Sequence, residues 1–173
     1  MTPSTPWVVV DGLAEAVSVA GAFGSALVVD LENTLVDYGS SADDRLAAMS
    51  AALDAVAADG RLRRLAFVSN GRFSAPLPAL SHPAVEVETL AGARKPYVWL
   101  PPLRALRSSL AGATVYGDQP LTDGRLARNL GGVWLQPCHA VVVSPDEPWW
   151  PRVMRRRGAR VVRRHFSPLV PNL

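Results

Sequence analysis

Residues 26–35 read ALVVDLENTL, an apolar run that gives way abruptly to polar residues. The segment Ala26 to Asp30 predicts a buried strand, because uninterrupted apolar residues are typical of strands covered on both faces. Leu65 to Ser69 (LAFVS) and Thr114 to Tyr116 (TVY) are two further apolar runs that lead into polar residues. Ligands of open parallel sheets bind beyond the carboxyl ends of the strands. The sequence therefore predicts an α/β fold with a polar site at one edge of its sheet.

Segments of helical character separate these runs. Ala42 to Ala58 has apolar residues at spacings of three and four, and Gly60 is expected to end this helix. Tyr97 to Leu110 is predicted as a helix whose regular part begins at Pro101, and Thr122 to Leu130 as a shorter helix. Further strands are expected at Val85–Val87, Val133–Leu135 and Ala140–Val143. The alternation predicts a Rossmann-like fold, with a central, mostly parallel sheet and helices on both faces.

The length of the chain is typical of one domain. It has 173 residues, of which 49% are hydrophobic, enough for a substantial core. We expect a single domain over residues 1–173, with a lead-in at 1–25, a motif-bearing core at 26–145 and an arginine-rich segment at 146–173. Within the lead-in, Gly12 to Ala20 fits a helix, and Trp7 to Val10 fits a strand or an apolar anchor. The sequence does not choose between these interpretations.

The cellular compartment is predicted from the number of cysteines, the first residues and the longest apolar stretch. Cys138 is the one cysteine, so no intramolecular disulfide can form. A secretory signal requires a basic residue ahead of an apolar run, and residues 1–7 include none. The longest uncharged apolar stretch, residues 16–29, is too short to cross a bilayer as a helix. We expect a cytoplasmic protein, with peripheral membrane association as the alternative.

Charge is distributed unevenly along the chain. Residues 1–150 contain 11 Lys and Arg against 15 acids, a net charge of −4, whereas residues 151–173 contain seven arginines and no acid. Three interpretations of this tail are open: a solvated cationic face, contact with anionic lipid headgroups, or nucleic-acid binding. The last is the least favoured, because no nucleic-acid-binding motif accompanies the charge.

Polar residues follow the predicted strands in a defined order. The first strand leads to Asp30, Glu32 and Thr34, the second to Ser69 and Asn70, and the later strand to Asp118, with Asp123 five residues further on. Lys95, in the stretch Ala93-Arg94-Lys95-Pro96, lies between them. A carboxylate at a strand end is suited to attack phosphorus, and Mg²⁺ prefers carboxylate oxygens together with substrate phosphate and water. These residue types predict a site that handles a phosphate ester with Mg²⁺.

Together these segments resemble the four motifs of the haloacid dehalogenase (HAD) superfamily of phosphotransferases, and most closely its YqeG-like, phosphatidylglycerophosphate phosphatase-like subgroup. The matching stretches are DLENTL at 30–35, Ser69-Asn70, Lys95-Pro96 and GDQPLTD at 117–123. No one motif is specific by itself, but four in the family's order after predicted strands are a strong joint signal.

The resemblance implies a role for each residue. Asp30 would be the nucleophile that forms an aspartyl-phosphate, and Glu32 the acid and base. Thr34, Ser69, Asn70 and Lys95 would hold the phosphoryl group, although Asn70 fits a structural hydrogen bond as well. Mg²⁺ would be held by Asp30, Asp118 and the main-chain carbonyl of Glu32. Asp123 would either join these ligands or stabilise the start of the following helix.

Glu32 departs from the family pattern, which usually has Asp at this position. Its extra methylene changes the reach of the carboxyl group, and a misplacement of about 1 Å can lower a rate 10²-fold. Two functions therefore stand. The first is a Mg²⁺-dependent phosphatase with little or no cap domain, acting on a phosphorylated lipid or another large substrate. The second is a catalytically weakened HAD-like domain that serves as a binding module.

Overall fold

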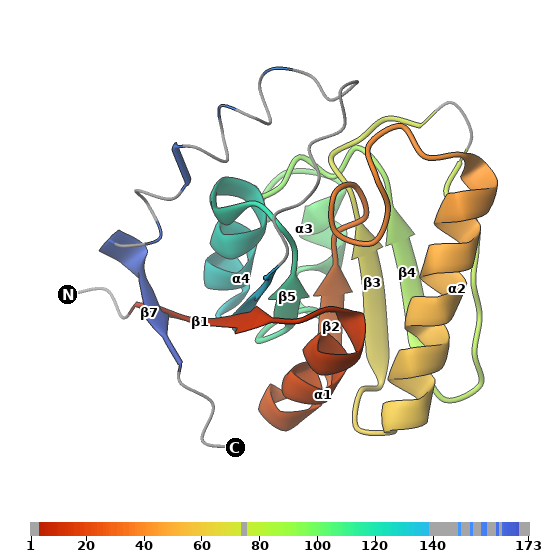
Figure 1. Cartoon of the computed structure of the whole chain (residues 1–173), viewed down its shortest axis with the longest axis horizontal. Helices are drawn as coiled ribbons and strands as arrows, with labels where there is room; N and C mark the ends of the chain where they lie inside the picture. The colour runs from red at the N-terminus through yellow and green to blue at the C-terminus, as the bar shows by residue number, and fades with distance from the viewer. Residues whose placement is uncertain are drawn as a thin grey trace.

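A computed structural model describes residues 4–73 and 76–138, and in the last part of the chain residues 149, 153, 157, 158, 162 and 164–169. Figure 1 shows the arrangement of its strands and helices. The strands are β1 (Thr5–Val10), β2 (Ala26–Val29), β3 (Arg64–Val68), β4 (Glu86–Leu90), β5 (Thr114–Tyr116), β6 (Trp134–Pro137) and β7 (Phe166–Pro168). The helices are α1 (Leu13–Phe23), α2 (Ala42–Asp59), α3 (Leu103–Leu106), the π-helical turn η1 (Pro120–Gly124) and α4 (Arg125–Leu130).

Within the described residues, seven strands form one sheet in the order β4-β3-β2-β5-β6-β1-β7, and every pairing is parallel. The predicted α/β class and parallel sheet are thus confirmed, and the sheet is compatible with a Rossmann-like fold. β2 lies in the interior, with Val28 opposite Ala66 of β3 and Val115 of β5. The carboxyl ends of β2, β3, β4 and β5 consequently meet at one edge of the sheet (Figure 1).

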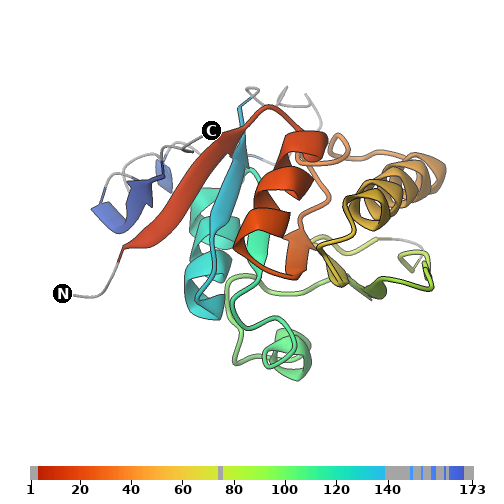
Figure 2. The same cartoon turned by 90° about the horizontal axis from the view of Figure 1, so that it is seen from below.

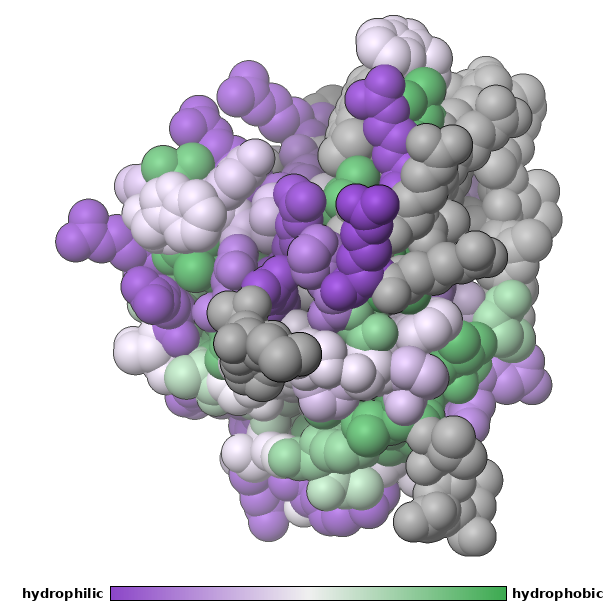
Figure 3. Space-filling model, turned by 90° about the vertical axis from the view of Figure 1, so that its left-hand side faces the viewer, coloured by the Kyte–Doolittle hydropathy of each residue, from purple (hydrophilic) through white to green (hydrophobic). Residues whose placement is uncertain are grey.

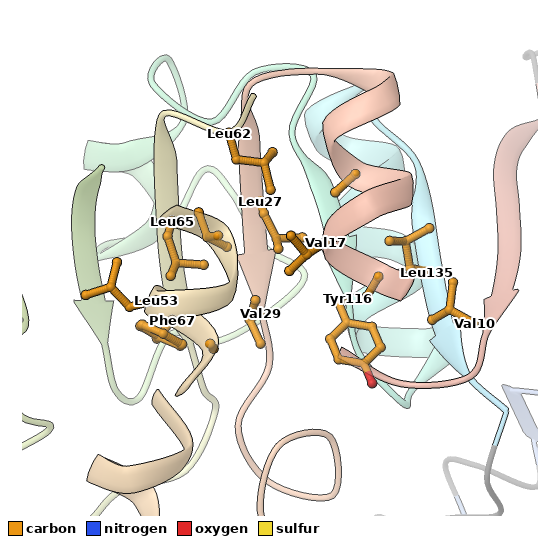
Figure 4. Packing of buried hydrophobic residues seen from close by; sticks show 14 of the residues in the cluster. Val10, Val17, Leu27, Val29, Leu53, Leu62, Leu65, Phe67, Tyr116 and Leu135 are labelled. Carbon is orange, nitrogen blue, oxygen red and sulfur yellow. The ribbon is translucent and has the colours of Figure 1, made fainter. Parts of the chain in front are cut away.

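Helices cover both faces of this sheet, as the view from below shows (Figure 2). Successive residues of β2 face opposite sides. Leu27 and Val29 belong to a core shared with α1 and α2, whereas Val28 belongs to a core shared with α3 and α4. Figure 4 shows the first of these cores, where Leu27 and Val29 of β2 lie near Val17 of α1. All residues of β2 are apolar because the strand is buried on both of its faces.

The residues at the two ends of helix α2 determine where it begins and ends. The Ser41 hydroxyl accepts a hydrogen bond from Asp44 N at 3.1 Å, and the Asp44 carboxylate accepts one from Ser41 N at 3.2 Å. This capping box satisfies amide groups that the first turn leaves without helical partners. Gly60 ends the helix in the left-handed conformation, with φ at 71°. The predicted helix Ala42–Ala58 is confirmed to within one residue.

Other segments differ from their predictions. Only Leu103–Leu106 of the predicted helix Tyr97–Leu110 is α-helical, because Pro101 and Pro102 have no amide hydrogen and residues 97–100 form turns instead. The weak strand predicted at Val85–Val87 is the longer edge strand β4. Two segments of the lead-in, which the sequence left open, form β1 and α1 and belong to the same sheet and core. The predicted strand at Ala140–Val143 lies outside the described residues.

The surface of the described residues carries both polar and apolar side chains. The face on the side of β1 and β7, seen in Figure 3, carries an apolar zone beside hydrophilic side chains. Among the helices of the described residues, none is both long and apolar enough to cross a lipid bilayer.

Candidate active site

Asp30 lies directly after β2, at the carboxyl edge of the sheet. Its amide donates to Tyr116 O at 2.9 Å, which continues the pairing of β2 with β5, and its side chain is 9% exposed. The chain then turns sharply, because Leu31 O accepts hydrogen bonds from the amides of residues 34, 35 and 36. Asn33 adopts the left-handed conformation that this turn requires, with φ at 60°. The turn brings the Thr34 hydroxyl back over the end of the strand.

The Thr34 hydroxyl joins two of the predicted motifs. It accepts a hydrogen bond from Asp118 N at 3.1 Å and lies 3.5 Å from Asp30 Oδ2, to which it donates. Thr34 was predicted to hold phosphate. In this structure its hydroxyl fixes the loop after β2 against the loop after β5.

Lys95 is the cation at the centre of the site. Its Nζ lies 2.5 Å from Asp30 Oδ1 and 2.7 Å from Asp123 Oδ1, and the Lys95 side chain is 2% exposed. The Asn70 side chain holds the main chain at this position, since its Oδ1 accepts from Lys95 N at 2.6 Å and its Nδ2 donates to Lys95 O at 3.4 Å. The amide of Asn70 therefore positions the main chain at Lys95, as its structural interpretation predicts, and the phosphate contact of Asn70 stays a prediction.

Asp123 is held by the unusual turn η1. The main-chain oxygen of Gln119 accepts hydrogen bonds from Thr122 N, Asp123 N and Gly124 N, of which the last spans five residues as in a π-helix. Gln119 N donates to Asp123 Oδ2 at 3.0 Å. A side chain at Gly117 would overlap the Asp123 carboxylate. Asp123 is fully buried, with one oxygen on Lys95 and the other on a main-chain amide.

Three carboxylates meet at this point in a geometry that suits a divalent cation. One ligand oxygen each from Asp30, Asp118 and Asp123 lies within 4.8 Å of the others, and all three residues are buried. Lys95 contacts two of these carboxylates, those of Asp30 and Asp123. Carboxylate oxygens are the donors that Mg²⁺ takes. The residues present therefore fit the predicted metal.

Burial and neighbouring charges alter the proton affinities of the site. Burial raises the pKa of Asp30 to about 7, with Asp123 and Glu32 adding to the effect and Lys95 opposing it. Burial also raises the pKa of Glu32, against the hydrogen bond from Ser69 and the charges of Lys95 and Arg45. Burial alone would lower the pKa of Lys95, but Asp123 and Asp30 outweigh it and the pKa is raised. Lys95 therefore stays protonated, while Glu32 and Asp30 bind protons more readily than exposed carboxylates.

Glu32 lies at the opposite side of the site, against the loop after β3. Ser69 Oγ donates to Glu32 Oε2 at 3.2 Å and accepts from Gly71 N at 2.9 Å. A side chain at Gly71 would overlap Glu32 Oε2. The longer carboxylate at position 32 thus occupies space that the absence of a side chain at position 71 leaves open.

These residues surround a cavity of about 90 Å³ at the edge of the sheet. Five of the predicted residues line it: Asp30, Glu32, Ser69, Asn70 and Lys95. Three predicted residues lie next to this lining: Thr34 donates to Asp30, Asp123 accepts from Lys95, and a carboxylate oxygen of Asp118 lies within 4.8 Å of one from Asp30. The sequence did not identify the five other lining residues as part of the site: Asn33, Tyr38, Gly71, Gln119 and Thr122. Three of the five directly follow a predicted site residue, but polar and glycine residues in loops are too common for this position to distinguish them.

The arginine-rich tail lies largely outside the described residues. Of its arginines, the structure describes only those at 157 and 164, and both are exposed. The three interpretations of the tail therefore remain predictions.

Comparison of the chain with models of protein families, with curated proteins and with solved structures found no match in any of the three.

Proposed function

We propose that this protein is a Mg²⁺-dependent phosphatase of the HAD type, which hydrolyses a phosphate monoester through an aspartyl-phosphate on Asp30. The observation that carries the proposal is the convergence of Asp30, Lys95, Asp118 and Asp123 at the carboxyl edge of a parallel sheet. Three separate segments of the chain supply a carboxylate nucleophile, a buried ammonium within 2.7 Å of two carboxylates, and three acids with ligand oxygens within 4.8 Å of one another. Buried groups in a cavity whose pKa values are strongly shifted are typical of active sites.

In the first step, a carboxylate oxygen of Asp30 attacks phosphorus and the bond from phosphorus to the ester oxygen breaks. Lys95 stabilises the negative charge that gathers on the phosphoryl oxygens. Glu32 donates a proton to the departing alcohol oxygen, a role that its raised pKa supports. Bound Mg²⁺, held by Asp30, Asp118 and Asp123 or the Glu32 carbonyl, would supply further positive charge to the phosphate.

In the second step, the Glu32 carboxylate removes a proton from a water molecule that attacks the aspartyl-phosphate. The bond between Asp30 and phosphorus breaks, inorganic phosphate leaves, and Asp30 returns as a free carboxylate. Glu32 then carries the proton that it donates in the next turnover. Over the two steps the phosphate ester and one water molecule give the alcohol and inorganic phosphate, and Asp30 and Glu32 return to their starting states.

The segments between the motifs favour a large substrate. Between Asp30 and Ser69 there are 38 residues, of which 18 form α2, and between Ser69 and Lys95 there are 25. Neither segment is long enough for a large lid domain, which supports a capless or minimally capped site. Without a lid that excludes solvent around a small metabolite, a lipid or another large phosphorylated molecule is the better candidate.

The decisive experiment compares the wild type with Asp30→Asn on p-nitrophenyl phosphate, with and without Mg²⁺. We expect the wild type to require Mg²⁺ and the variant to lose more than about 10³-fold in rate, as enzymes do when a nucleophile is removed. Asp54→Asn, an exposed aspartate on α2, is the matched control and should retain full activity. Equal rates for Asp30→Asn and wild type would contradict the proposal.

The second candidate function, a catalytically weakened HAD-like domain that binds its ligand, is favoured by Glu32 itself. Glu32→Asp separates the two. A large gain in hydrolysis would indicate that Glu32 impairs an otherwise complete site. A loss would indicate that Glu32 is adapted to its place, which the space left by Gly71 supports.

A further inference from the structure

Two arginines flank the candidate active site on loops that are bonded to each other. Arg72 follows Gly71 and Arg94 precedes Lys95, and both Gly71 and Lys95 line the catalytic cavity. Gly92 N donates to Gly71 O at 2.9 Å, which ties the loop after β4 to the loop after β3. The positions of the two arginines relative to the site are therefore fixed by main-chain hydrogen bonds.

Both arginines line a second cavity, larger and more open than the catalytic one. Its volume is about 580 Å³, and Phe73 and the pair Pro101 and Pro102 form much of its apolar wall. Both arginines are exposed. Neither guanidinium has a hydrogen bond or an ion pair with another group in the part of the chain that the structure describes. The two cations are thus available to a ligand in the cavity.

The main chain at Arg94 separates the two cavities. Arg94 has a φ of 58°, in the left-handed region that few residues other than glycine adopt. Immediately after it, the Lys95 side chain is 2% exposed and contacts the buried carboxylates, whereas Arg94 is exposed and lines the second cavity. Consecutive residues therefore serve adjoining cavities.

The charges of the two cavities differ in sign. Among the described residues, the lining of the catalytic cavity has two acids, Asp30 and Glu32, and one cation, Lys95, whereas the lining of the second cavity has two arginines and no acid. A guanidinium presents paired donors that match the oxygens of a phosphate or carboxylate. An anionic group that is not hydrolysed is therefore favoured in the second cavity, beside the two arginines, and disfavoured next to the aspartates of the catalytic cavity.

We infer that Arg72 and Arg94 bind a second anionic group of the substrate, a phosphate or a carboxylate, while the phosphate ester lies at Asp30. The inference rests on the proposed function and extends it: the substrate carries two anionic groups separated by a spacer. The apolar wall formed by Phe73 and the two prolines accommodates the spacer. A membrane surface that supplies the second anion is the other source of the same chemistry.

Direct binding tests this inference without turnover. Asp30→Asn protein in Mg²⁺ is titrated calorimetrically with 1,n-alkanediol bisphosphates of increasing length, and with alkyl monophosphates of the same lengths. We expect one spacer length to bind at least about tenfold more tightly than its monophosphate. Adding Arg72→Gln or Arg94→Gln should each remove most of that preference. Arg63→Gln, an exposed arginine at the opposite end of β3, should retain it.

The outcomes separate this inference from the proposed function. Monophosphate binding without a bisphosphate preference, or a preference that survives both arginine substitutions, overturns the inference and leaves the proposed function intact. Failure to bind either ester contradicts both. A third arm adds vesicles of phosphatidylglycerol to wild type hydrolysing a monophosphate. Stimulation that depends on Arg72 and Arg94, together with no bisphosphate preference, overturns the inference in favour of the membrane as the source of the anion.

Discussion

Replacing Lys95 by methionine removes the ammonium that Asp30 and Asp123 share. Its Nζ lies 2.5 Å and 2.7 Å from their oxygens, and the side chains of all three residues are less than 10% exposed. Little of either carboxylate is therefore open to water that could replace the lost interaction. Removing one member of a buried ion pair typically costs about 3–5 kcal/mol, because the remaining charge is left buried without compensation.

The cost of Lys95→Met should depend on pH in a defined direction. Lys95 lowers the pKa of Asp30, so without Lys95 this pKa rises further in the folded protein, while the unfolded chain keeps the ordinary value. Between these two pKa values the folded state binds more protons than the unfolded state, so stability falls as pH rises. We therefore expect the full loss near pH 8 and a smaller loss near pH 5, where the Asp30 carboxylate is protonated in the folded protein.

Urea unfolding of metal-free protein at pH 5 and pH 8 measures both quantities. Arg63→Met, an exposed cation, is the control and should change the free energy of unfolding by less than about 0.5 kcal/mol. Asp123→Asn added to Lys95→Met should recover part of the loss, because it removes one of the two uncompensated charges. A loss below about 1 kcal/mol at pH 8, or the same loss at both pH values, would refute the reasoning.

Three further predictions concern the same site. Gly71→Ala should lower hydrolysis by at least about tenfold with little loss of stability, because the added carbon displaces the Glu32 carboxylate, whereas Gly24→Ala, where nothing lies within 4 Å, should have no effect in the same assay. In EDTA, wild-type stability should fall as the pH rises from about 4 to about 7, because the pKa of Asp30 is about 7 in the folded protein and 3.8 for an ordinary aspartate. In Asp30→Asn this fall should be reduced, and an unchanged profile would contradict the assignment. Mg²⁺ at a hundred times its Kd should raise the free energy of unfolding by about 2.7 kcal/mol at pH 8. Asp118→Asn should weaken this effect and Asp54→Asn should not, so equal metal stabilisation of both variants would remove Asp118 from the ligand set.

The sequence predicted the strands and helices whose signals are local. β5 has the predicted bounds, and β2 differs only in that Asp30 follows the strand, because a short apolar run between polar loops has few alternatives. Helix α2 was predicted within one residue because Gly60 and the apolar spacing both lie within the segment. These elements place Asp30 and Asp118 at the same edge, which the sequence alone was sufficient to suggest.

The remainder depended on interactions between distant residues. The bond between the Asn70 amide and the main chain of Lys95 joins segments 25 residues apart, and no local pattern distinguishes it from a phosphate contact. Residues 122–124 of the π-helical turn that holds Asp123 against Lys95 were predicted as the start of an α-helix, since the two kinds of helix share similar sequence signals. The fit between Glu32 and Gly71 was likewise visible only once both loops had been placed.

The position of β1 in the sheet has a consequence for how the chain is made. β1 is hydrogen-bonded on one side to β6 at residues 134–137 and on the other to β7 at residues 166–168. During synthesis, β1 therefore emerges well before β6 and β7, the two strands that it pairs with. Strands β2 to β5 lie between β1 and β6 in the chain and can pair among themselves earlier, so the edge that carries the candidate site can assemble before β1 joins the sheet.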